Sequence, residues 1–247
     1  MQPVEAALET AVIVMQNGGS TVAAARSFND ILKGYKEDGV SAVWRLDFIA
    51  ATSSGEGQSR TIVRPVGPIG VNLVRASQIA VFGEHVARGE ITTAAVDAQI
   101  AHIKQLPSSY SRWLALVAAA CIAGSLSRFA GGDWGSFGIV LVAAAVGQIV
   151  RSLLQARKVP VASVTLICGV LSACIACLGL RLGFSQVASV TLIASVVYLA
   201  PGLPLINGFV DVVSHKYLFV GIERIANALY LFLILAIAIA LASAVVM

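Results

Sequence analysis

Charged residues are scarce in this chain. Asp, Glu, Lys and Arg make up 12% of its 247 residues, whereas hydrophobic residues make up 57%, and the mean hydropathy is +0.85. Because ordinary soluble domains are about one quarter charged, the composition excludes a typical soluble protein and predicts an integral membrane protein. After residue 110 there are only three acidic residues against eight basic ones. These bases lie near the ends of hydrophobic runs, so the pI of about 9.0 does not indicate nucleic-acid binding.

Cysteine and histidine are also few. All four cysteines lie inside hydrophobic runs. The C-x-x-C spacing of Cys174 and Cys177 would suggest a redox or metal-binding dithiol in a soluble protein, but in a membrane helix it favours close packing. The three histidines have no metal-ligand spacing: His85, His102 and His215. We therefore expect no metal and no cofactor.

The signals for secretion and for hydrolysis are missing. The first residues lack the basic flank and apolar run of a secretory signal, so we expect that the amino terminus is not exported by that route. A polar turn contains Ser53 and Ser54, but Gly-x-Ser-x-Gly is absent and no His or Asp is placed to complete a triad. We expect that the chain is not an enzyme. A membrane-anchored sensor or a hydrolase with an amino-terminal catalytic domain is the alternative.

Residues 1–109 predict a small cytoplasmic α+β domain. This part contains nine basic and ten acidic residues, which suits a water-soluble segment. Apolar residues recur at helical spacing in segments such as 5–16. Segment 41–51 is instead rich in residues that favour strands, and a polar turn follows at 53–57. The expected elements are helices at 5–16, 20–35, 71–88 and 92–105 and strands at 41–51 and 60–66.

Residues 110–247 predict a transmembrane domain of five helices. A hydrocarbon core requires about 20 residues of helix. The fourth apolar run has only 14 residues, 187–200, before Pro201, so we expect the chain beyond the break to complete that crossing. The expected spans are 113–130, 137–154, 159–180, 187–211 (broken at 201–204) and 228–246.

The positive-inside rule predicts the orientation. Seven bases flank the spans on one side and only Arg128 and Arg181 lie on the other. This places the amino-terminal domain in the cytoplasm and the carboxyl terminus on the far side of the cytoplasmic (inner) membrane. The seven bases are Lys104, Arg112, Arg151, Arg157, Lys158, Lys216 and Arg224.

The fourth span is the candidate transport site. Pro201, Gly202 and Pro204 interrupt a hydrophobic run, and prolines and glycines there free backbone groups that lipid cannot satisfy. We expect the helix to restart near Leu205. Asn207 and Asp211 then lie on one face, four residues apart. Broken spans that carry polar side chains are typical of transport sites, although a helix that simply ends at the water boundary is the alternative.

Several of these groups suit a small carboxylate. The restarted helix would offer free amides and the positive end of its dipole, and Asn207 both donates and accepts. Asp211 would bind a substrate ammonium group or carry a coupling proton, or else pair with Lys216 or Arg224.

Arg151 is the candidate cation in the second span. With Gln148 on the same face, it could bind a carboxylate through two parallel hydrogen bonds if it faces the helix bundle. An arginine that extends to the cytoplasmic interface is the alternative.

Several segments carry a family resemblance. They are 70–75, 131–134, Arg151 in Val-Arg-Ser-Leu-Leu, 201–211 with its specific Pro-Gly-Leu-Pro-Leu-x-Asn motif, Gly221 and Arg224. On these residues the chain resembles the threonine/serine exporter family, particularly the short-form subunits of its two-component members, which include a succinate exporter. The resemblance covers nearly the whole chain. One departure is Ala23-Ala24-Ala25, where the family often has Arg-Val-Glu.

The resemblance implies a subunit of a secondary active exporter. Fused members carry a second, smaller membrane module that this chain lacks, so the resemblance implies a separate small membrane subunit as partner. The substrate would be a small carboxylate or amino acid, either a succinate-like dicarboxylate or threonine/serine. No internal duplication is visible, and five spans cannot form a complete inverted repeat, so we also expect an oligomer in the lipid bilayer.

Overall fold

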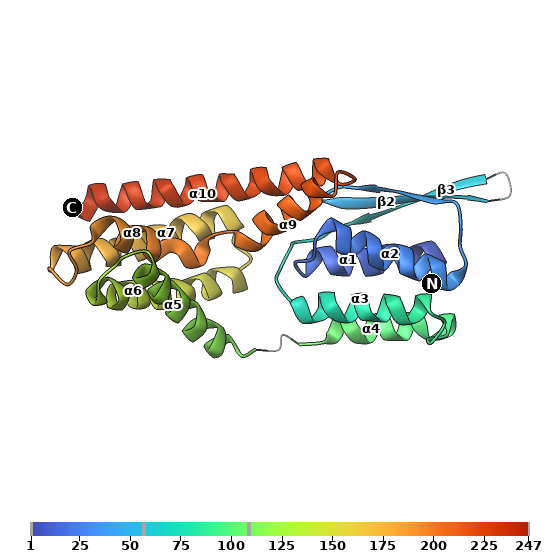
Figure 1. Cartoon of the computed structure of the whole chain (residues 1–247), viewed down its shortest axis with the longest axis horizontal. Coiled ribbons are helices and arrows are strands. Elements are labelled where there is room, and N and C mark those ends of the chain that lie inside the picture. The colour runs from blue at the N-terminus through green and yellow to red at the C-terminus, as the bar shows by residue number, and fades with distance from the viewer. Residues whose placement is uncertain (1, 56–57, 108–109, 247) are drawn as a thin grey trace. The chain divides into compact units, whose positions relative to one another are not determined.

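The computed structural model describes residues 2–55, 58–107 and 110–246 and divides them into two compact units (Figure 1). The first unit comprises residues 1–109 together with 202–226, and the second comprises 110–201 and 227–247. The segment 202–226 thus belongs to the same compact unit as the amino-terminal residues.

The first unit is built around one buried helix. Ten of the 14 residues of α1 (Pro3–Gln16) are buried, on every side of the helix, as expected for a helix that other elements surround. The other elements of this unit are α2 (Thr21–Tyr35), β1 (Val40–Trp44), β2 (Phe48–Gly55), β3 (Gln58–Pro65), α3 (Leu73–Ala87), a short 3-10 turn (Thr93–Ala95), α4 (Val96–Gln105), α9 (Gly202–Val213) and the start of α10 (Leu218–Val246).

The three strands form an antiparallel sheet in the order β1-β2-β3. One face is buried, with Ile49 and Ala51 fully inaccessible, whereas Val43 and Val63 are exposed. Trp44 links this sheet to the rest of the unit through edge-to-face contacts with Phe28 on α2 and with Tyr217. The segment between α9 and α10 therefore takes part in the packing of the first unit.

The prediction of a single strand at 41–51 is wrong. The structure has two strands there, which turn at 45–47 and pair with Trp44 opposite Ile49. The amide of Arg45 donates to the carbonyl of Phe48 at 3.0 Å to close the turn. This turn contains no glycine or proline, so the sequence from 41 to 51 looks like one continuous strand. Ser53 and Ser54 also lie in β2 rather than in a turn.

The second unit is helical. It contains α5 (Arg112–Phe129), α6 (Trp134–Ala156), α7 (Val161–Arg181), α8 (Ala188–Val196), the 3-10 turn η2 (Val197–Leu199) and the remainder of α10. The buried face of α7 is made of small residues, which let neighbouring helix backbones approach closely in a membrane. The small buried residues are Gly169, Ser172, Ala173, Ala176, Cys177 and Gly179, and Val164, Thr165 and Cys168 are buried beside them.

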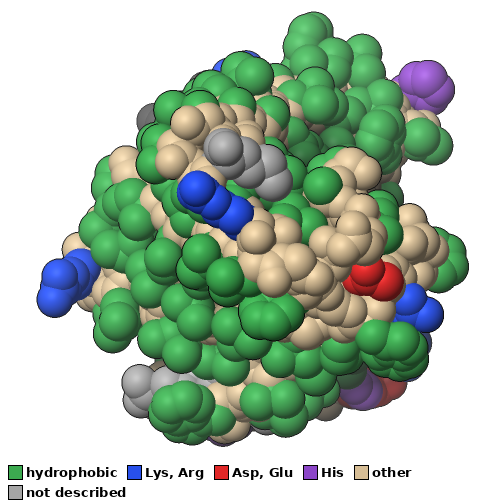
Figure 2. Space-filling view, turned by 90° about the vertical axis from the view of Figure 1, so that its left-hand side faces the viewer, with side chains coloured by type: hydrophobic (Ala, Val, Ile, Leu, Met, Phe, Trp, Pro, Cys, Tyr) green, Lys and Arg blue, Asp and Glu red, His purple; other side chains and the backbone are tan. Residues whose placement is uncertain are grey.

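Three helices in the described residues, α6, α7 and α10, are long and apolar enough to cross a membrane. The pair Ala188–Leu199 and Gly202–Val213 would make a fourth span, whereas the apolar part of α5, Trp113–Phe129, is shorter. Figure 2 shows many hydrophobic side chains on the face drawn there, with only scattered charges. The chain is therefore a mostly helical membrane protein with a small sheet, and three or four spans meet the criteria for length and apolarity.

Candidate functional site

The helix break lies at Ala200 and Pro201. The turn η2 ends at Leu199, Ala200 has an extended backbone, and α9 begins at Gly202. The helix therefore restarts three residues earlier than the expected Leu205. The reason is that Pro204 falls in the first turn of α9, where its missing N–H is not needed.

Asp211 is fully buried against the amino terminus of α2. Its Oδ1 accepts hydrogen bonds from the amides of Thr21 at 2.9 Å and Val22 at 3.2 Å, and its Oδ2 accepts one from the Thr21 hydroxyl at 2.8 Å. The first amides of a helix have no partner within the helix and bind anions well. The side chain of Ser20 caps the same helix by accepting from Ala23. The carboxylate of Asp211 thus occupies a ready-made anion site.

Arg224 completes the charge balance at this carboxylate. Its side chain is 3% exposed, and its Nε lies 3.1 Å from Asp211 Oδ2. The Nε–H is poorly aligned with that oxygen and makes no hydrogen bond within the described part of the chain, so the contact is a close ion pair. Nη2 also donates to the carbonyl of Gly19 at 3.4 Å. Of the two partners expected for Asp211, Lys216 and Arg224, it is Arg224 that forms an ion pair with Asp211 in the structure.

Asn207 joins the same cluster one turn earlier on α9. It is buried, and its Nδ2 donates to the carbonyl of Gly18 at 2.8 Å. Gly18 has a φ of +92°, a conformation that favours glycine. We call Thr21, Asn207, Asp211 and Arg224, with the carbonyls of Gly18 and Gly19, the α9 cluster. All its members belong to the first unit.

Two glycines allow α9 and α10 to touch. A Cβ atom at Gly221 would lie 2.7 Å from the carbonyl oxygen of Gly208 and 2.8 Å from the amide nitrogen of Val212. Both are backbone atoms and have little freedom to move away. This crossing therefore brings the helix that carries Asp211 up to the helix that carries Arg224.

Gln148 and Arg151 lie on α6 in the second unit. Arg151 Nη1 donates to the carbonyl of Tyr198 at 3.3 Å. The hydroxyl of Tyr198 lies 3.0 Å from Ser172 Oγ, which is also 3.1 Å from the carbonyl of Ala143. Arg151 is thus held by η2, the turn just before the helix break.

Gln148 has an unused acceptor in this group. Its Oε1 is buried and has no hydrogen-bond partner among residues 2–55, 58–107 and 110–246. Gly147, next to it, is required here because a Cβ would lie 1.8 Å from the Tyr198 hydroxyl. The unpaired oxygen makes Gln148 available to a donor from another molecule.

Sequence reasoning missed Thr21, Tyr198 and Ser172. The cap sequence at Ser20 signals a helix start, and hence free amides, but nothing in it points to a carboxylate 190 residues later. Tyr198 and Ser172 look like ordinary members of apolar runs. Ser53 donates to Glu37 at 3.5 Å, and the described residues contain no group of three or more His, Cys, Asp or Glu able to hold a metal ion.

Asp133 connects the start of α6 with the start of the α8 segment. Its Oδ1 accepts from the amide of Ser136 at 2.6 Å and its Oδ2 from the amide of Gln186 at 3.0 Å. These hydrogen bonds to the carboxylate hold the pKa of Asp133 below its ordinary value. The depressed pKa means that the charged form stabilises the folded state.

We expect Asp133→Ala to lower the thermal unfolding midpoint at neutral pH. The wild type gains stability from the ionised carboxylate above the unfolded-state pKa of about 4. It loses that stability as the pH falls through the lower, folded-state pKa. Midpoints of the two purified proteins from pH 7 to pH 3 should therefore converge at the acid end, and Asp133→Asn, which can still cap α6, should resemble the wild type more closely. A constant difference across this range would contradict the role of the charge.

Comparisons with known proteins agree with this architecture. A model of the threonine/serine exporter family (ThrE) matches residues 5–246. A protein of Klebsiella aerogenes named "Probable succinate transporter subunit YjjP" is 24% identical over 228 residues, which cover 91% of this chain and 86% of that protein. No solved structure matches the chain.

Proposed function

Because the chain belongs to the threonine/serine exporter family, whose members are membrane transporters, we propose that it is one subunit of a secondary active exporter of small carboxylates or amino acids. Its transport site would use the broken fourth span, with Pro201, Gly202 and Pro204 forming the break. Asn207 and Asp211 follow the break, and Gln148 and Arg151 are the further candidates for binding or coupling on α6.

The observation that carries this proposal is the buried charge cluster beyond the helix break. Asp211 and Arg224 are 0% and 3% exposed, and buried ionisable groups near a broken membrane helix are costly features that mark substrate or ion pathways. Asp211 is fully engaged by protein donors in this structure. We propose that transport requires this carboxylate to exchange partners, so that Arg224 and the α2 amides become available to a substrate carboxylate or Asp211 becomes available to a proton.

The substrate is proposed to be a succinate-like dicarboxylate, with threonine or serine as the competing class. The family name supports the amino acids, and the name of the Klebsiella aerogenes relative supports succinate. A dicarboxylate would need two cationic contacts, whereas an amino acid would need one cation and one acid. The cluster contains both Arg224 and Asp211, so transport measurements must separate the two classes.

We propose a separate small membrane subunit of the same family as partner, within a larger oligomer. The relative's name describes it as a subunit. We also propose that the complex lies in the inner membrane with residues 1–109 in the cytoplasm. The distribution of Lys and Arg supports this orientation.

Efflux of preloaded labelled succinate, and separately of labelled threonine, tests this proposal. Cells would express the chain with and without a co-encoded small membrane subunit. We expect efflux of succinate only when both chains are present. Efflux of threonine alone would overturn the dicarboxylate assignment, and no efflux of either substrate with both chains confirmed in the membrane would favour the sensor alternative.

A further inference from the structure

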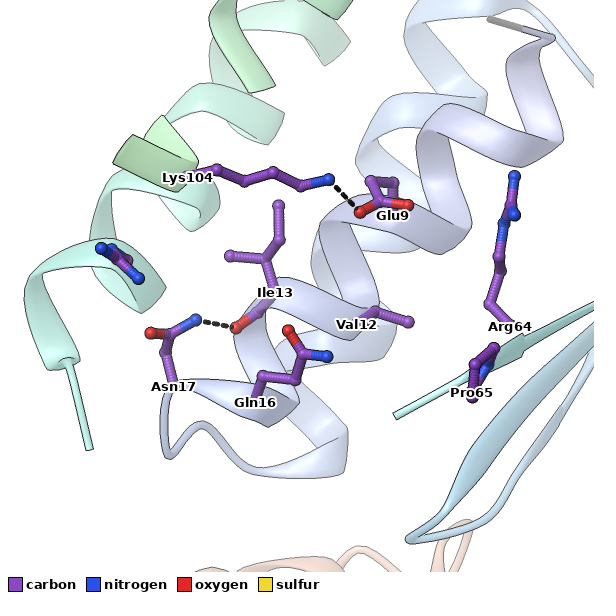
Figure 3. A pocket seen from close by; sticks show the side chains of 9 residues that line it. Glu9, Val12, Ile13, Gln16, Asn17, Arg64, Pro65 and Lys104 are labelled. Carbon is purple, nitrogen blue, oxygen red and sulfur yellow. Dashed lines mark hydrogen bonds and ion pairs between the residues drawn. The ribbon is translucent and has the colours of Figure 1, made fainter. Parts of the chain in front are cut away.

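A cavity of about 510 Å³ lies wholly within the first unit, away from the contacts of Asp211. Its walls come from α1, the end of β3, α3 and α4. Figure 3 shows that Glu9 on α1 and Lys104 face each other within it, and that Arg64 enters from the strand side. A volume of this size is typical of small-molecule sites.

The charged groups in this cavity are predominantly cationic. Arg64, Arg75 and Lys104 line it together with one acid, Glu9. Lys104 forms an ion pair with Glu9, and Arg75 Nε donates to the carbonyl of Leu106 at 2.6 Å. The four side chains leave a net charge of +2 in the cavity. Such an excess favours a doubly charged anion over a zwitterion.

Arg64 supplies an unused donor. Its Nε is buried but has no hydrogen-bond partner in residues 2–55, 58–107 and 110–246. A buried donor left unpaired is costly, and a ligand oxygen would remove that cost. Gln16 and Asn17 add amide groups to the same cavity. Guanidinium and amide donors together suit carboxylate oxygens.

We propose that this cavity binds a small dicarboxylate, at a site separate from the α9 cluster. The two arginines would hold the carboxylates, and Lys104 would remain as a neighbouring positive charge. The site therefore adds a cytoplasmic-domain ligand to the transport function proposed above, but it rests on the geometry of the first unit alone.

The cavity is connected to α9 through the turn that follows α1, so a bound ligand could influence α9. Gln16 and Asn17 directly precede Gly18 and Gly19, whose carbonyls accept from Asn207 and Arg224. The backbone of the same turn is tied to the segment before α3, because the amides of Gly70 and Asn72 donate to the carbonyls of Gln16 and Asn17. A ligand that orders this turn would favour the conformation in which α9 is held by α2. The population of this conformation, and with it the transport activity, would thus depend on the concentration of dicarboxylate.

Titration calorimetry on the purified full chain in detergent tests the site, with succinate, threonine and inorganic phosphate as the three probes. We expect succinate to bind more tightly than threonine or phosphate, and Arg64→Gln to weaken succinate binding about tenfold or more, as expected for loss of a hydrogen bond to a charged group. Arg75→Gln should also weaken it. Equal binding of threonine, tighter binding of phosphate, or no succinate binding would overturn the proposal.

Arg60→Gln is the matched control. Arg60 lies on the same strand, four residues before Arg64, but its side chain contacts Gln2 and Glu5 rather than the cavity. Succinate affinity should be unchanged in this variant, and the unfolding midpoints of all variants should be compared to confirm that they are folded. If folded Arg64→Gln and Arg75→Gln bind as the wild type does, the site is wrong. Because this assay uses one chain and measures binding, its failure would leave the two-chain efflux result unaffected.

Discussion

Replacing Asp211 by Asn should abolish export and destabilise the first unit by about 3 to 5 kcal/mol, the usual cost of breaking a buried ion pair from one side. The substitution leaves Arg224 buried without a counter-charge. It also replaces an acceptor-only group by an amide whose NH₂ would face the donors of Thr21 or Arg224. Thermal or denaturant unfolding of the purified protein measures the loss of stability, and efflux from cells with confirmed membrane levels measures the loss of export.

A double variant separates the ion pair from other roles of Asp211. Arg224→Met alone should also destabilise the protein, whereas Asp211→Asn with Arg224→Met should cost less than the sum of the single changes, because no unpaired charge remains. Asp38→Asn, at an exposed position in the same unit, is the control and should have little effect. Wild-type stability and export in Asp211→Asn would show that the α9 cluster is neither structural nor functional.

Gly221→Leu should disrupt the crossing of α9 and α10. The new side chain would have to enter space that the backbone of Gly208 and Val212 already fills. Overpacking of this kind typically costs about 1 to 3 kcal/mol, and here it would also move Arg224 away from Asp211. We expect a lower unfolding midpoint and little or no efflux, with Gly221→Ala intermediate.

Gly138→Ala is the matched control for that experiment. Gly138 also lies inside a helix, but a Cβ there would meet no atom within 4 Å. Alanine should be neutral or slightly stabilising because it favours the helix. If Gly221→Leu behaves like Gly138→Ala, the close approach of α9 and α10 is not required for export.

The sequence predicts much of the local structure because periodicity and turn residues are local signals. The helix expected at 5–16 occurs as α1, and the stop expected at Asn17-Gly18-Gly19 separates it from α2. Proline and glycine likewise predict the break before α9. The turn at 45–47 was missed because it contains neither glycine nor proline, and its one turn-favouring residue, Asp47, lies among residues that favour a strand.

Long-range pairing could not be predicted in the same way. The sequence suggests a pair between Asp211 and a nearby base, but the amides of Thr21 and Val22 lie 190 and 189 residues away. Periodicity and turn residues are local signals and do not indicate which distant segments meet. The interaction of Arg151 with the carbonyl of Tyr198 has the same origin, since a backbone acceptor has no sequence signature. The sequence therefore indicates the chemistry of single residues and a partner close in sequence, such as Arg224 for Asp211, but not the distant partners.

The 190-residue separation between Thr21 and Asp211 also has a consequence for biosynthesis. At about 5 to 20 residues per second, Thr21 is translated roughly 10 to 40 s before Asp211. During that interval the hydrophobic helices α5 to α8 are synthesised. Until Asp211 follows, the first amides of α2 lack the carboxylate that they bind in the folded chain. A polypeptide that ends at residue 109 would remain permanently at this stage, so structural work on the first unit calls for a chain that also supplies 202–226.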